Sequence, residues 1–444
     1  MRRFSLLSWL LLSLPVQSAP TSLLQAAGQS RIPCQTTLTD CPPGTIIVGK
    51  NDSRAHFTTI QAAIQALPDD DSPQTILILA GNYTEQLNIT RAGPVTLLGQ
   101  TAHPTDATQN KVTVFWAAAN SNTYPDNAYT SVLTVAPTLD ASLTGSGPTG
   151  YPVPPDTPFG NRDFRAYNVD FRNVFSEYSA GPALAVSLSY ANGGFYYCGF
   201  YSYQDTVYIG KLGNAYFYSS IIAGQTDFLY GFGTAWFQSS QLVLRNCGGG
   251  ITAWKGTNTT FPNKYGVYIV DSRITAANAS VAQIIQGKCA LGRPWNSQHR
   301  SIFARTYEDG SIISSGYIDW IVDGVGRYTP NVTLMAEYKT YGPGFNLTGR
   351  LDGKVDTLLS DAQYAAYDSP AKVFQTETGE FGNVGWIDWT PWSQRTAFDA
   401  FYHLGDDSDC CPCDLDDRAL KLLLVDAAPI PSQKLIKAPK MAAK

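Results

Sequence analysis

Three stretches of this chain share a pattern of aromatic residues followed by two small residues, and this pattern decides the fold. They are Gly194-Phe195-Tyr196-Tyr197-Cys198-Gly199-Phe200, Ala215-Tyr216-Phe217-Tyr218-Ser219-Ser220-Ile221 and Ala235-Trp236-Phe237-Gln238-Ser239-Ser240-Gln241. If Cys198, Ser219 and Ser239 are equivalent points, the unit recurs after 21 and then 20 residues. A unit this short cannot bury its own apolar face, so its copies must stack on one another. The repeat therefore predicts an all-β solenoid.

The segments before this repeat agree with a mainly β structure. Residues 57–68 place apolar side chains three and four apart and end at a proline, which predicts one short amphipathic helix. Residues 75–80 and 95–99 are compact apolar runs typical of strands, and residues 81–85 predict a turn. Short strands without helices between them favour a solenoid, a barrel or a sandwich over a βαβ fold, and the repeat selects the solenoid.

Changes of composition predict how the chain is organised. Residues 118–161 and 248–266 are rich in turn-forming residues, which predicts long loops that wall a groove beside the solenoid. We expect the solenoid domain over residues 51–405 and an N-terminal extension over 19–50. Residues 406–444 are acidic and cysteine-rich, then dotted with lysine, and predict a peripheral tail.

The first residues indicate export. Arg2 and Arg3 precede an apolar run over residues 6–16, which is typical of a secretory signal peptide over residues 1–18. This run is too short to span a bilayer, and no later segment has the roughly 18 uninterrupted apolar residues that a spanning helix needs. We therefore expect a secreted, extracellular protein with no membrane partner.

Potential modification sites agree with export. Seven Asn-x-Ser/Thr triplets predict a surface glycoprotein, because glycosylation needs the triplet on an accessible segment. The acceptors are Asn51, Asn82, Asn88, Asn258, Asn278, Asn331 and Asn346. Eight cysteines suit an oxidising compartment, and over this length they predict a lightly cross-linked protein.

The cysteine spacing settles little of the disulfide pairing. Cys34 and Cys41 are close enough to close a small loop. The partners of the other cysteines cannot be read from the sequence. These are Cys198, Cys247 and Cys289 in the solenoid region and Cys410, Cys411 and Cys413 in the tail. A zinc site at the tail trio is disfavoured, because no histidine stands nearby at the usual ligand spacing.

The charge excludes nucleic acid as a partner. Removing residues 1–18 takes two arginines from 31 basic residues, which leaves 29 against 36 acidic residues and a net charge of −7. Such a protein gains nothing from counterion release, and no basic run with interleaved aromatics is present. We expect a monomer, the default for a solenoid that carries a groove.

Two carboxylates and one arginine carry the chemistry. The step from Asp205 to Asp227 matches the length of one coil, so we expect them on adjacent coils roughly 4.8 Å apart along the stack. Two acids that close cannot both ionise easily, so one keeps its proton while the other stays a carboxylate. Arg293 follows downstream. The alternative is a buried ion-pair ladder that only braces the coils.

A serine hydrolase is disfavoured. The chain contains no Gly-x-Ser-x-Gly turn and only four histidines. A carboxylate pair steadied by an arginine is the better candidate for ester chemistry.

Four blocks, in order and spacing, resemble the signature blocks of the pectin methylesterases (pectinesterases). They are Gly81-Asn82-Tyr83-Thr84-Glu85, Tyr203-Gln204-Asp205-Thr206-Val207-Tyr208, Asp227-Phe228-Leu229-Tyr230-Gly231 and Leu291-Gly292-Arg293-Pro294-Trp295. The resemblance covers residues 57 to about 392. It implies a right-handed parallel β-helix whose external groove binds pectin. It also implies cleavage of the methyl esters of polygalacturonate to pectate and methanol, with no metal or other cofactor.

The resemblance assigns roles position by position. Asp227 would be the nucleophile, and Asp205 the acid toward the leaving methoxide and then the base toward water. Arg293 would hold Asp227 ionised and oriented. Gln204 would donate a hydrogen bond to the oxyanion.

One departure from the family concerns the oxyanion hole. The family carries a second glutamine one coil below, and counting back from Gln204 by the step that separates the two aspartates gives Pro182, which has no amide side chain to donate. Losing one such donor can cost about 2.7 to 4 kcal/mol of transition-state stabilisation. Gln225 precedes Asp227 by two residues, so on a strand it faces the same way, and we expect it to supply the missing donor. The alternative is that Gln225 is a solvated glutamine of the groove with no role in the reaction.

Aromatic residues around the site predict contacts with sugar rings. They are Trp295, the strongest candidate, together with Tyr208, Phe228 and Tyr230. The alternative is that such rings fill the coil interior or stack on one another.

Two rival functions stay open. One is a pectin-binding protein that has lost turnover through Pro182, and the other is an esterase of the same mechanism that acts on a different ester. A polysaccharide lyase is disfavoured, because those enzymes typically need acidic calcium ligands and the four blocks do not resemble them.

Overall fold

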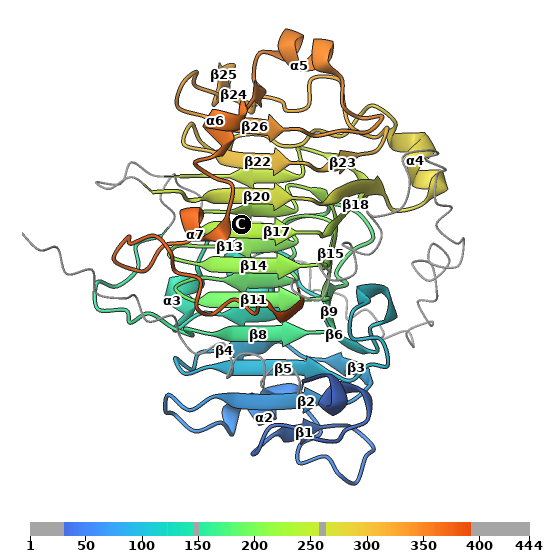
Figure 1. Cartoon of the computed structure of the whole chain (residues 1–444), viewed down its shortest axis with the longest axis vertical. Coiled ribbons are helices and arrows are strands. Elements are labelled where there is room, and N and C mark those ends of the chain that lie inside the picture. The colour runs from blue at the N-terminus through green and yellow to red at the C-terminus, as the bar shows by residue number, and fades with distance from the viewer. Residues whose placement is uncertain (1–30, 122, 146–150, 257–262, 392–444) are drawn as a thin grey trace, which may run out of the picture.

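The protein is a parallel β-helix, as predicted. The computed structural model describes residues 31–121, 123–145, 151–256 and 263–391. The chain winds through three sheets in turn, here called sheets A, B and C, and each strand pairs with its equivalents on neighbouring coils. Figure 1 shows the strands of sheet A stacked like rungs along the long axis. The expected signal peptide, the tail over 406–444 and the acceptor Asn258 lie outside the described residues.

Strands of two to eight residues build the three sheets. In stacking order, sheet A contains β1 (Ile46–Val48), β2 (Gln74–Ile78), β5 (Val95–Gly99), β8 (Phe164–Tyr167), β11 (Asn192–Tyr196), β14 (Asn214–Tyr218), β17 (Thr234–Gln238), β20 (Gly266–Val270), β22 (Arg300–Ala304), β26 (Leu334–Tyr338) and the two-residue β27 (Thr357–Leu358). Sheet B contains β3 (Gly81–Thr84), β6 (Val112–Trp116), β9 (Val169–Asn173), β12 (Gly199–Tyr201), β15 (Ile221–Thr226), β18 (Gln241–Gly248), β21 (Arg273–Ala276) and the two-residue β23 (Tyr307–Glu308). Sheet C contains β4 (Leu87–Ile89), β7 (Leu133–Val135), β10 (Val186–Leu188), β13 (Val207–Ile209), β16 (Leu229–Gly231) and β19 (Thr252–Trp254). A separate hairpin is formed by β24 (Ile321–Val322) and β25 (Val325–Gly326).

Like residues stack on like residues in the interior. Phe195, Phe217 and Phe237 lie on successive strands of sheet A, with ring centroids 4.8 and 4.3 Å apart. All three are fully buried. Offset stacking of this kind adds to the free energy gained by burying apolar area, so the aromatic repeat itself stabilises the coil stack.

The expected equivalence of Cys198 with Ser219 and Ser239 is wrong by one residue. The Cys198 amide donates to Ser220 Oγ at 3.1 Å, and the Ser220 amide donates to Ser240 Oγ at 3.2 Å. The true steps are therefore 22 and 20 residues. The residue before each of these positions has a positive φ and forms the corner between sheets A and B. The sequence alone does not distinguish the corner residue from the one after it, because both are small in two of the three copies.

The tyrosine-rich outer face of sheet A is covered by a C-terminal arm, residues 374–391, which crosses the strands of that sheet (Figure 1). Tyr167 donates its hydroxyl hydrogen bond to Asp388 Oδ2 at 2.7 Å. The ring of Tyr216 lies 5.8 Å from that of Trp389. Much of the aromatic content of the chain is therefore structural.

The helices are short and lie at the edges of the solenoid. They are α2 (Ile60–Gln65), α3 (Leu139–Ser142), α4 (Ala279–Ile285), α5 (Leu347–Gly353), α6 (Asp361–Tyr364) and α7 (Pro370–Val373), with 3-10 turns η1 (Ala107–Gln109) and η2 (Asn127–Thr130). The predicted helix is α2, whose apolar face packs on the N-terminal end of the core. The Glu85 carboxylate accepts hydrogen bonds from the first two amides of α2 at 3.0 and 2.9 Å. No helix within the described ranges is long and apolar enough to cross a membrane.

Three expected boundaries are corrected. Residues 81–85 were expected to turn, but most of them form β3 in sheet B. The expected loop region 118–161 contains β7, which lies in sheet C between β4 and β10. Residues 46–48, which fall in the expected N-terminal extension, form β1 and pair with β2 in sheet A. Solenoid strands of three residues carry too little alternation to stand out from a loop.

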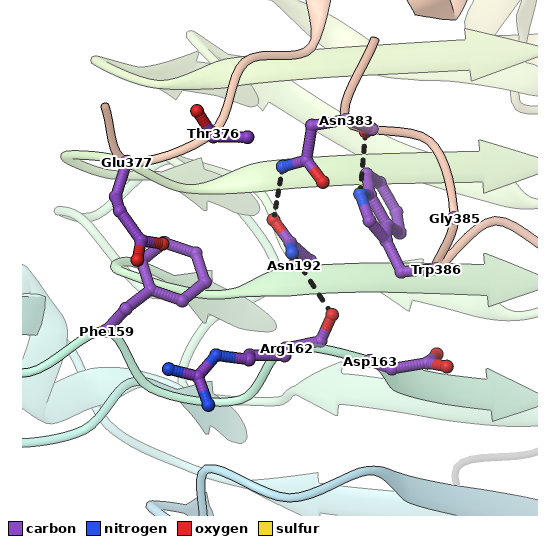
Figure 2. A pocket seen from close by; sticks show the side chains of 9 residues that line it. All are labelled: Phe159, Arg162, Asp163, Asn192, Thr376, Glu377, Asn383, Gly385 and Trp386. Carbon is purple, nitrogen blue, oxygen red and sulfur yellow. Dashed lines mark hydrogen bonds between the residues drawn. The ribbon is translucent and has the colours of Figure 1, made fainter. Parts of the chain in front are cut away.

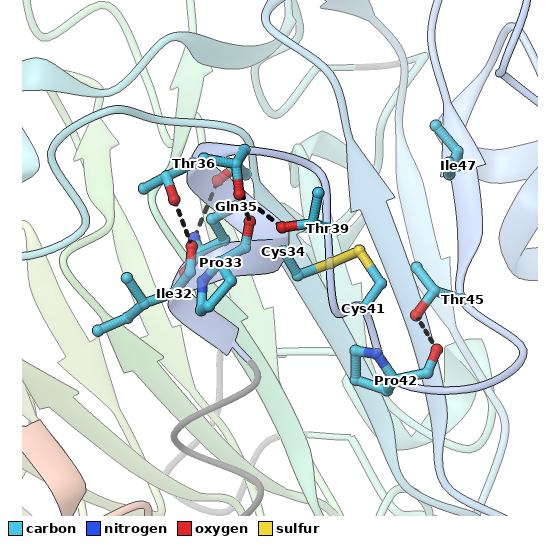
Figure 3. The surroundings of a disulfide bond; sticks show 12 residues. Ile32, Pro33, Cys34, Gln35, Thr36, Thr39, Cys41, Pro42, Thr45 and Ile47 are labelled. Carbon is cyan, nitrogen blue, oxygen red and sulfur yellow. Dashed lines mark hydrogen bonds between the residues drawn. A yellow bond between two sulfur atoms is a disulfide. The ribbon is translucent and has the colours of Figure 1, made fainter.

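The predicted disulfide between Cys34 and Cys41 is present and joins a helical turn over residues 31–36 to the chain that leads into β1 (Figure 3). Beside it, the side-chain Nε2 of Gln35 donates to the carbonyl of Gly99 at 2.9 Å, which ties this end of the chain to sheet A. A second disulfide joins Cys247 and Cys289. Cys198 is a free, buried thiol.

Candidate active site

Asp205 and Asp227 occupy equivalent corners on successive coils. Asp205 lies between β12 and β13, and Asp227 lies between β15 and β16. Gln204 bridges to Thr226, and the Asp205 amide donates to the Thr226 carbonyl at 3.0 Å. Both aspartates have left-handed φ angles, 61° and 48°, which aspartate adopts more readily than most residues. The structure thus brings the two carboxyl groups onto adjacent coils.

Arg293 forms a two-pronged ion pair with Asp227. Its Nε lies 3.0 Å from Oδ1, and its Nη2 lies 2.6 Å from Oδ2. The backbone amide of Gly250 adds a third donor, 3.1 Å from Oδ1. Charge-assisted bonds in this fork geometry fix both the orientation and the ionisation of a carboxylate.

Glycine makes this close approach possible. Gly249 has a φ of +61°, and a Cβ there would clash with Asp227 Oδ1 and lie 2.7 Å from Arg293 Cζ. Any side chain at this position would therefore displace the ion pair.

The arginine is itself held from three sides. Its amide donates to the carbonyl of Thr252 at 3.0 Å, and its Cζ lies 3.7 Å from the ring centroid of Trp320. The disulfide from Cys247 to Cys289 joins the end of β18 to the segment that carries Arg293.

The two carboxyl groups have different electrostatic surroundings. Burial and the charge of Asp227 raise the pKa of Asp205 well above its usual value, and Arg293 opposes this only partly. Burial also raises the pKa of Asp227, but the hydrogen bonds and charge of Arg293 and the amide of Gly250 pull it down. Asp227 therefore ionises first, which leaves Asp205 as the protonated partner.

Gln204 and Gln225 are brought together by one serine. The Ser179 hydroxyl donates to Gln204 Oε1 at 2.8 Å, and the Ser179 amide donates to Gln225 Oε1 at 3.3 Å. A backbone amide can only donate, so the Gln225 oxygen must face it. Among the described residues, no acceptor takes a hydrogen bond from either NH2 group, so both remain available to a ligand.

A β-bulge places Gln225 at this position. The amides of Gln225 and Thr226 both donate to the carbonyl of Tyr203, at 2.7 and 2.9 Å, and the register to the next strand shifts between Gly224 and Thr226. Bulges commonly re-aim side chains beside functional sites.

The coil below Gln204 matches the expectation. The Ala183 backbone amide donates to the carbonyl of Gln204 at 3.1 Å, just as the Asp205 amide donates to the carbonyl of Thr226, the bridge partner of Gln204. Pro182 therefore lies below Gln204. The step shortens by one residue only beyond this corner, in the pairing of β10 with β13. Proline has no amide side chain, so the coil itself provides no second donor here.

Three of the predicted sugar-binding rings are covered. Phe228 is 0% exposed and lies in the interior core, so its assignment as a substrate contact is wrong. Its neighbour Asp227 is in the left-handed corner, which turns the next side chain inward. Tyr208 and Tyr230 are 1% and 3% exposed and pack against each other outside sheet C, with centroids 4.8 Å apart and ring planes tilted by 42°, so neither presents a free ring face.

Trp295 is the half-buried ring of this group. It lies 5.6 Å from the ring of Tyr230, and the Nζ of Lys255 lies 3.9 Å from its centroid. Trp295 packs against the small buried cluster that contains both tyrosines. Burial lowers the pKa of Lys255 to about 8.

Three residues near the pair were missed from the sequence. Ser179 and Trp320 are described above, and the third is Asn127, whose Nδ2 lies 3.2 Å from Asp205 Oδ2. Asn127 is 78 residues from Asp205 in the chain, and no local pattern marks it. Trp320 lies well downstream of the Leu-Gly-Arg-Pro-Trp block and is signalled only by being a large aromatic beside a turn.

A separate cavity of about 310 Å³ lies under the C-terminal arm (Figure 2). Its lining residues are Phe159, Arg162, Asp163, Asn192, Thr376, Glu377, Asn383, Gly385 and Trp386. Across it, the side-chain Nδ2 of Asn383 donates to Asn192 Oδ1 at 3.3 Å. It shares no residue with the surroundings of Asp205 and Asp227, so it is not part of the candidate active site.

Comparisons with known proteins point to one family and one fold. A family model described as Pectinesterase matches residues 158–376. A pectinesterase of Aspergillus aculeatus is 30% identical over 318 residues, which are 71% of this chain and 84% of that protein. The pectin methylesterase of Aspergillus niger shares the fold, with a TM-score of 0.60 and 24% identity over 78% of this chain and 97% of that chain. A pectin methylesterase solved in complex with a hexasaccharide has a TM-score of 0.57 and 25% identity over 76% of this chain and 98% of that chain.

Proposed function

The chain belongs to the pectinesterase family, and from this premise we propose that it hydrolyses the methyl esters of pectin to pectate and methanol, with Asp227 as nucleophile and Asp205 as acid and base. The observation that carries the assignment is the unequal environment of the pair. Asp227 has the two-pronged bond to Arg293 and the amide of Gly250, whereas Asp205 has burial and a neighbouring negative charge. A nucleophile must be ionised and a general acid must be protonated, and the two environments favour those states in that order.

In the first half of the reaction, an Asp227 oxygen attacks the ester carbonyl carbon. The new C–O bond pushes the carbonyl electron pair onto its oxygen, where the free NH2 groups of Gln204 and Gln225 donate to the developing charge. The bond to the methoxy oxygen then breaks, and Asp205 gives its proton to that oxygen. Methanol leaves, and the galacturonyl group stays on Asp227 as an acyl intermediate.

In the second half, water resolves the intermediate. Asp205, now a carboxylate, takes a proton from water, and the hydroxyl oxygen attacks the acyl carbon. The bond to Asp227 breaks, which frees a galacturonic acid group and restores both aspartates to their starting states. No proton is lost from the pair over the cycle.

The direct test is methanol release from highly methylated pectin by wild type, Asp227→Asn and Asp205→Asn. We expect each variant to lose at least about 10³-fold in kcat. Asp271→Asn is a matched control, because Asp271 also has a left-handed φ and a two-pronged bond to Arg305, at a different corner of the solenoid. Binding of pectin without methanol above the Asp227→Asn background would favour a binding protein instead.

The role proposed for Gln225 has its own test. Gln225→Ala should lower kcat on methylated pectin by about tenfold or more, because one oxyanion donor is removed. An unchanged kcat would reject Gln225 as a donor and leave Gln204 as the oxyanion residue.

Trp295 is proposed as the sugar-stacking residue, because it is the half-exposed ring beside Arg293. Trp295→Ala should raise KM more than it lowers kcat. A change in kcat alone would instead indicate that the ring only supports the site.

We further propose that the chain is exported, glycosylated and monomeric. The acceptors Asn51, Asn82, Asn88, Asn331 and Asn346 are exposed and Asn278 is half-buried. Two disulfides lie in the described residues. Secretion from a eukaryotic host should give a protein that lacks residues 1–18 and loses mass on treatment with an endoglycosidase, and light scattering should give the mass of one chain.

A further inference from the structure

A loop residue reaches the proposed acid. The loop between β6 and β7 contains η2, and the first residue of η2 is Asn127. The Asn127 Nδ2 lies 3.2 Å from Asp205 Oδ2 and 3.0 Å from the hydroxyl oxygen of Tyr230. An amide NH2 has two hydrogens, so one serves each acceptor.

The orientation of this amide is fixed by a second asparagine. The Asn120 Nδ2 donates to Asn127 Oδ1 at 2.6 Å. Because the two ends of a planar amide point apart, holding the oxygen at Asn120 aims the NH2 at Asp205. The backbone amide of Asn120 donates to the carbonyl of Pro182 at 2.8 Å, so the pair of asparagines is anchored where the coil lacks a side-chain amide.

The loop is tied down at both ends by one buried residue. Asn173, 3% exposed, donates from Nδ2 to the carbonyls of Ala118 and Thr130, at 2.9 and 3.0 Å. Asp126 accepts hydrogen bonds from the amides of Ala128 and Thr144, both at 2.9 Å. A side chain held this way is positioned before substrate arrives and does not have to be ordered during the reaction.

On the basis of the proposed function, we propose that Asn127 is a positioning residue for Asp205. By donating to Oδ2, it makes that oxygen the acceptor and leaves the transferable proton on Oδ1. When Asp205 gives this proton to the leaving methoxide, the neutral carboxyl becomes a carboxylate, and the bond from Asn127 becomes charge-assisted. The contact is therefore stronger after proton transfer than before it, which is the condition for accelerating the step.

The charged and titratable groups that face Asp205 are Asp227, Arg293 and Tyr230. Burial raises the pKa of Tyr230 well above its usual value, so it stays a neutral phenol. Removal of the Asn127 donor should raise the pKa of Asp205 further, because a donor favours the ionised form.

The test uses Asn127→Leu, which keeps the volume and removes the donor, and Asn127→Asp, which replaces the NH2 by an oxygen. Thr123→Ala is the control, an exposed position in the same loop. With methylated pectin, we expect kcat to fall about tenfold or more in Asn127→Leu and further in Asn127→Asp, with KM within about twofold. The alkaline limb of kcat/KM should move to higher pH in both. Thr123→Ala should match wild type.

A readout without turnover separates this inference from the proposed function. The carboxyl resonance of Asp205, titrated by carbon NMR with Asp205→Asn as the assignment control, should move to a higher midpoint in Asn127→Leu than in wild type. If wild type releases methanol but Asn127→Leu keeps its kcat and pH profile, the role of Asn127 is wrong and the proposed function stands. If wild type releases none, the proposed function fails, and an unchanged NMR midpoint then rejects the Asn127 contact as well.

Discussion

The disulfide between Cys247 and Cys289 joins the strand that leads to Gly250 to the segment that carries Arg293. The two groups that hold Asp227 therefore share one covalent link. The bridge closes a separation of 42 residues, and a cross-link of that span contributes about 4 kcal/mol in the chain-entropy model.

Replacing both cysteines of this bridge by serine should lower activity as well as stability. We expect an unfolding free energy about 2 to 4 kcal/mol lower and a kcat reduced in the variant that remains folded, because Arg293 loses a support. Replacing Cys34 and Cys41 by serine is the comparison. That bridge lies outside the site, so it should lower stability while kcat at a temperature well below unfolding stays unchanged. Equal effects of the two double variants on kcat would contradict the positional role.

Arg293→Lys should separate charge from geometry. Lysine keeps the charge but cannot make the two-pronged bond, so we expect kcat to fall by about 10²-fold. Arg293 lowers the pKa of Asp227, so weakening the contact should raise that pKa, and the acidic limb of kcat/KM should move to higher pH. Arg305→Lys, at the two-pronged pair with Asp271, should leave both kcat and the acidic limb unchanged. An acidic limb that stays in place would mean that Asp227 is not the group that titrates there.

The adjacency of Asp205 and Asp227 was predictable because the coil that joins them has the length assumed from the repeat. The same step also holds one coil below, where Pro182 lies under Gln204, and it shortens by one residue only in the strands that follow, where Val186 pairs with Val207. Coil length is set by corners, irregular pairings and loops, which the strand pattern does not record. Counting by one coil length therefore does not fix the register of the strands.

Side-chain direction was predictable on strands and not at corners. Phe228 was expected beside Asp227 on the surface, but the left-handed corner turns it into the core. The position of Asn127 beside Asp205 could not be predicted, for a different reason. Its loop is held at both ends by the buried Asn173, which is far away in the sequence, and such a contact leaves no local signature.

Ser179→Ala should reveal whether Ser179 aligns the oxyanion donors. The variant removes the hydroxyl that holds Gln204 but keeps the amide that holds Gln225. We expect kcat on methylated pectin to fall by about three- to tenfold. In a double-mutant cycle with Gln204→Ala, the two losses should be far from additive, because the serine acts through the glutamine. Additive losses would mean that Ser179 contributes by another route.

A buried acidic cluster far along the solenoid should make stability depend on pH. Arg350 contacts Glu308 at 2.6 Å, Glu337 at 2.5 Å and Asp356 at 3.4 Å, and all four side chains are fully buried. One positive charge cannot offset three negative ones, so protons are retained. Burial raises the pKa of Asp356 to about 10 and that of Glu308 well above its usual value. Against the effect of burial, hydrogen bonds from these two acids and Arg350 hold the pKa of Glu337 below its usual range.

The sign follows from proton linkage. The folded state keeps a proton on Asp356 up to a pKa of about 10, whereas the unfolded chain releases it near pH 4. The folded state therefore binds more protons across this window, and stability should fall as pH rises from about 4 toward 10. Asp356→Asn mimics the protonated acid and keeps a donor for Glu337, so its unfolding temperature should fall less steeply with pH and exceed that of wild type at pH 9. Asp361→Asn, at an exposed carboxylate paired with Lys339, should run parallel to wild type. Parallel slopes for wild type and Asp356→Asn in calorimetry would show that the cluster does not hold this proton.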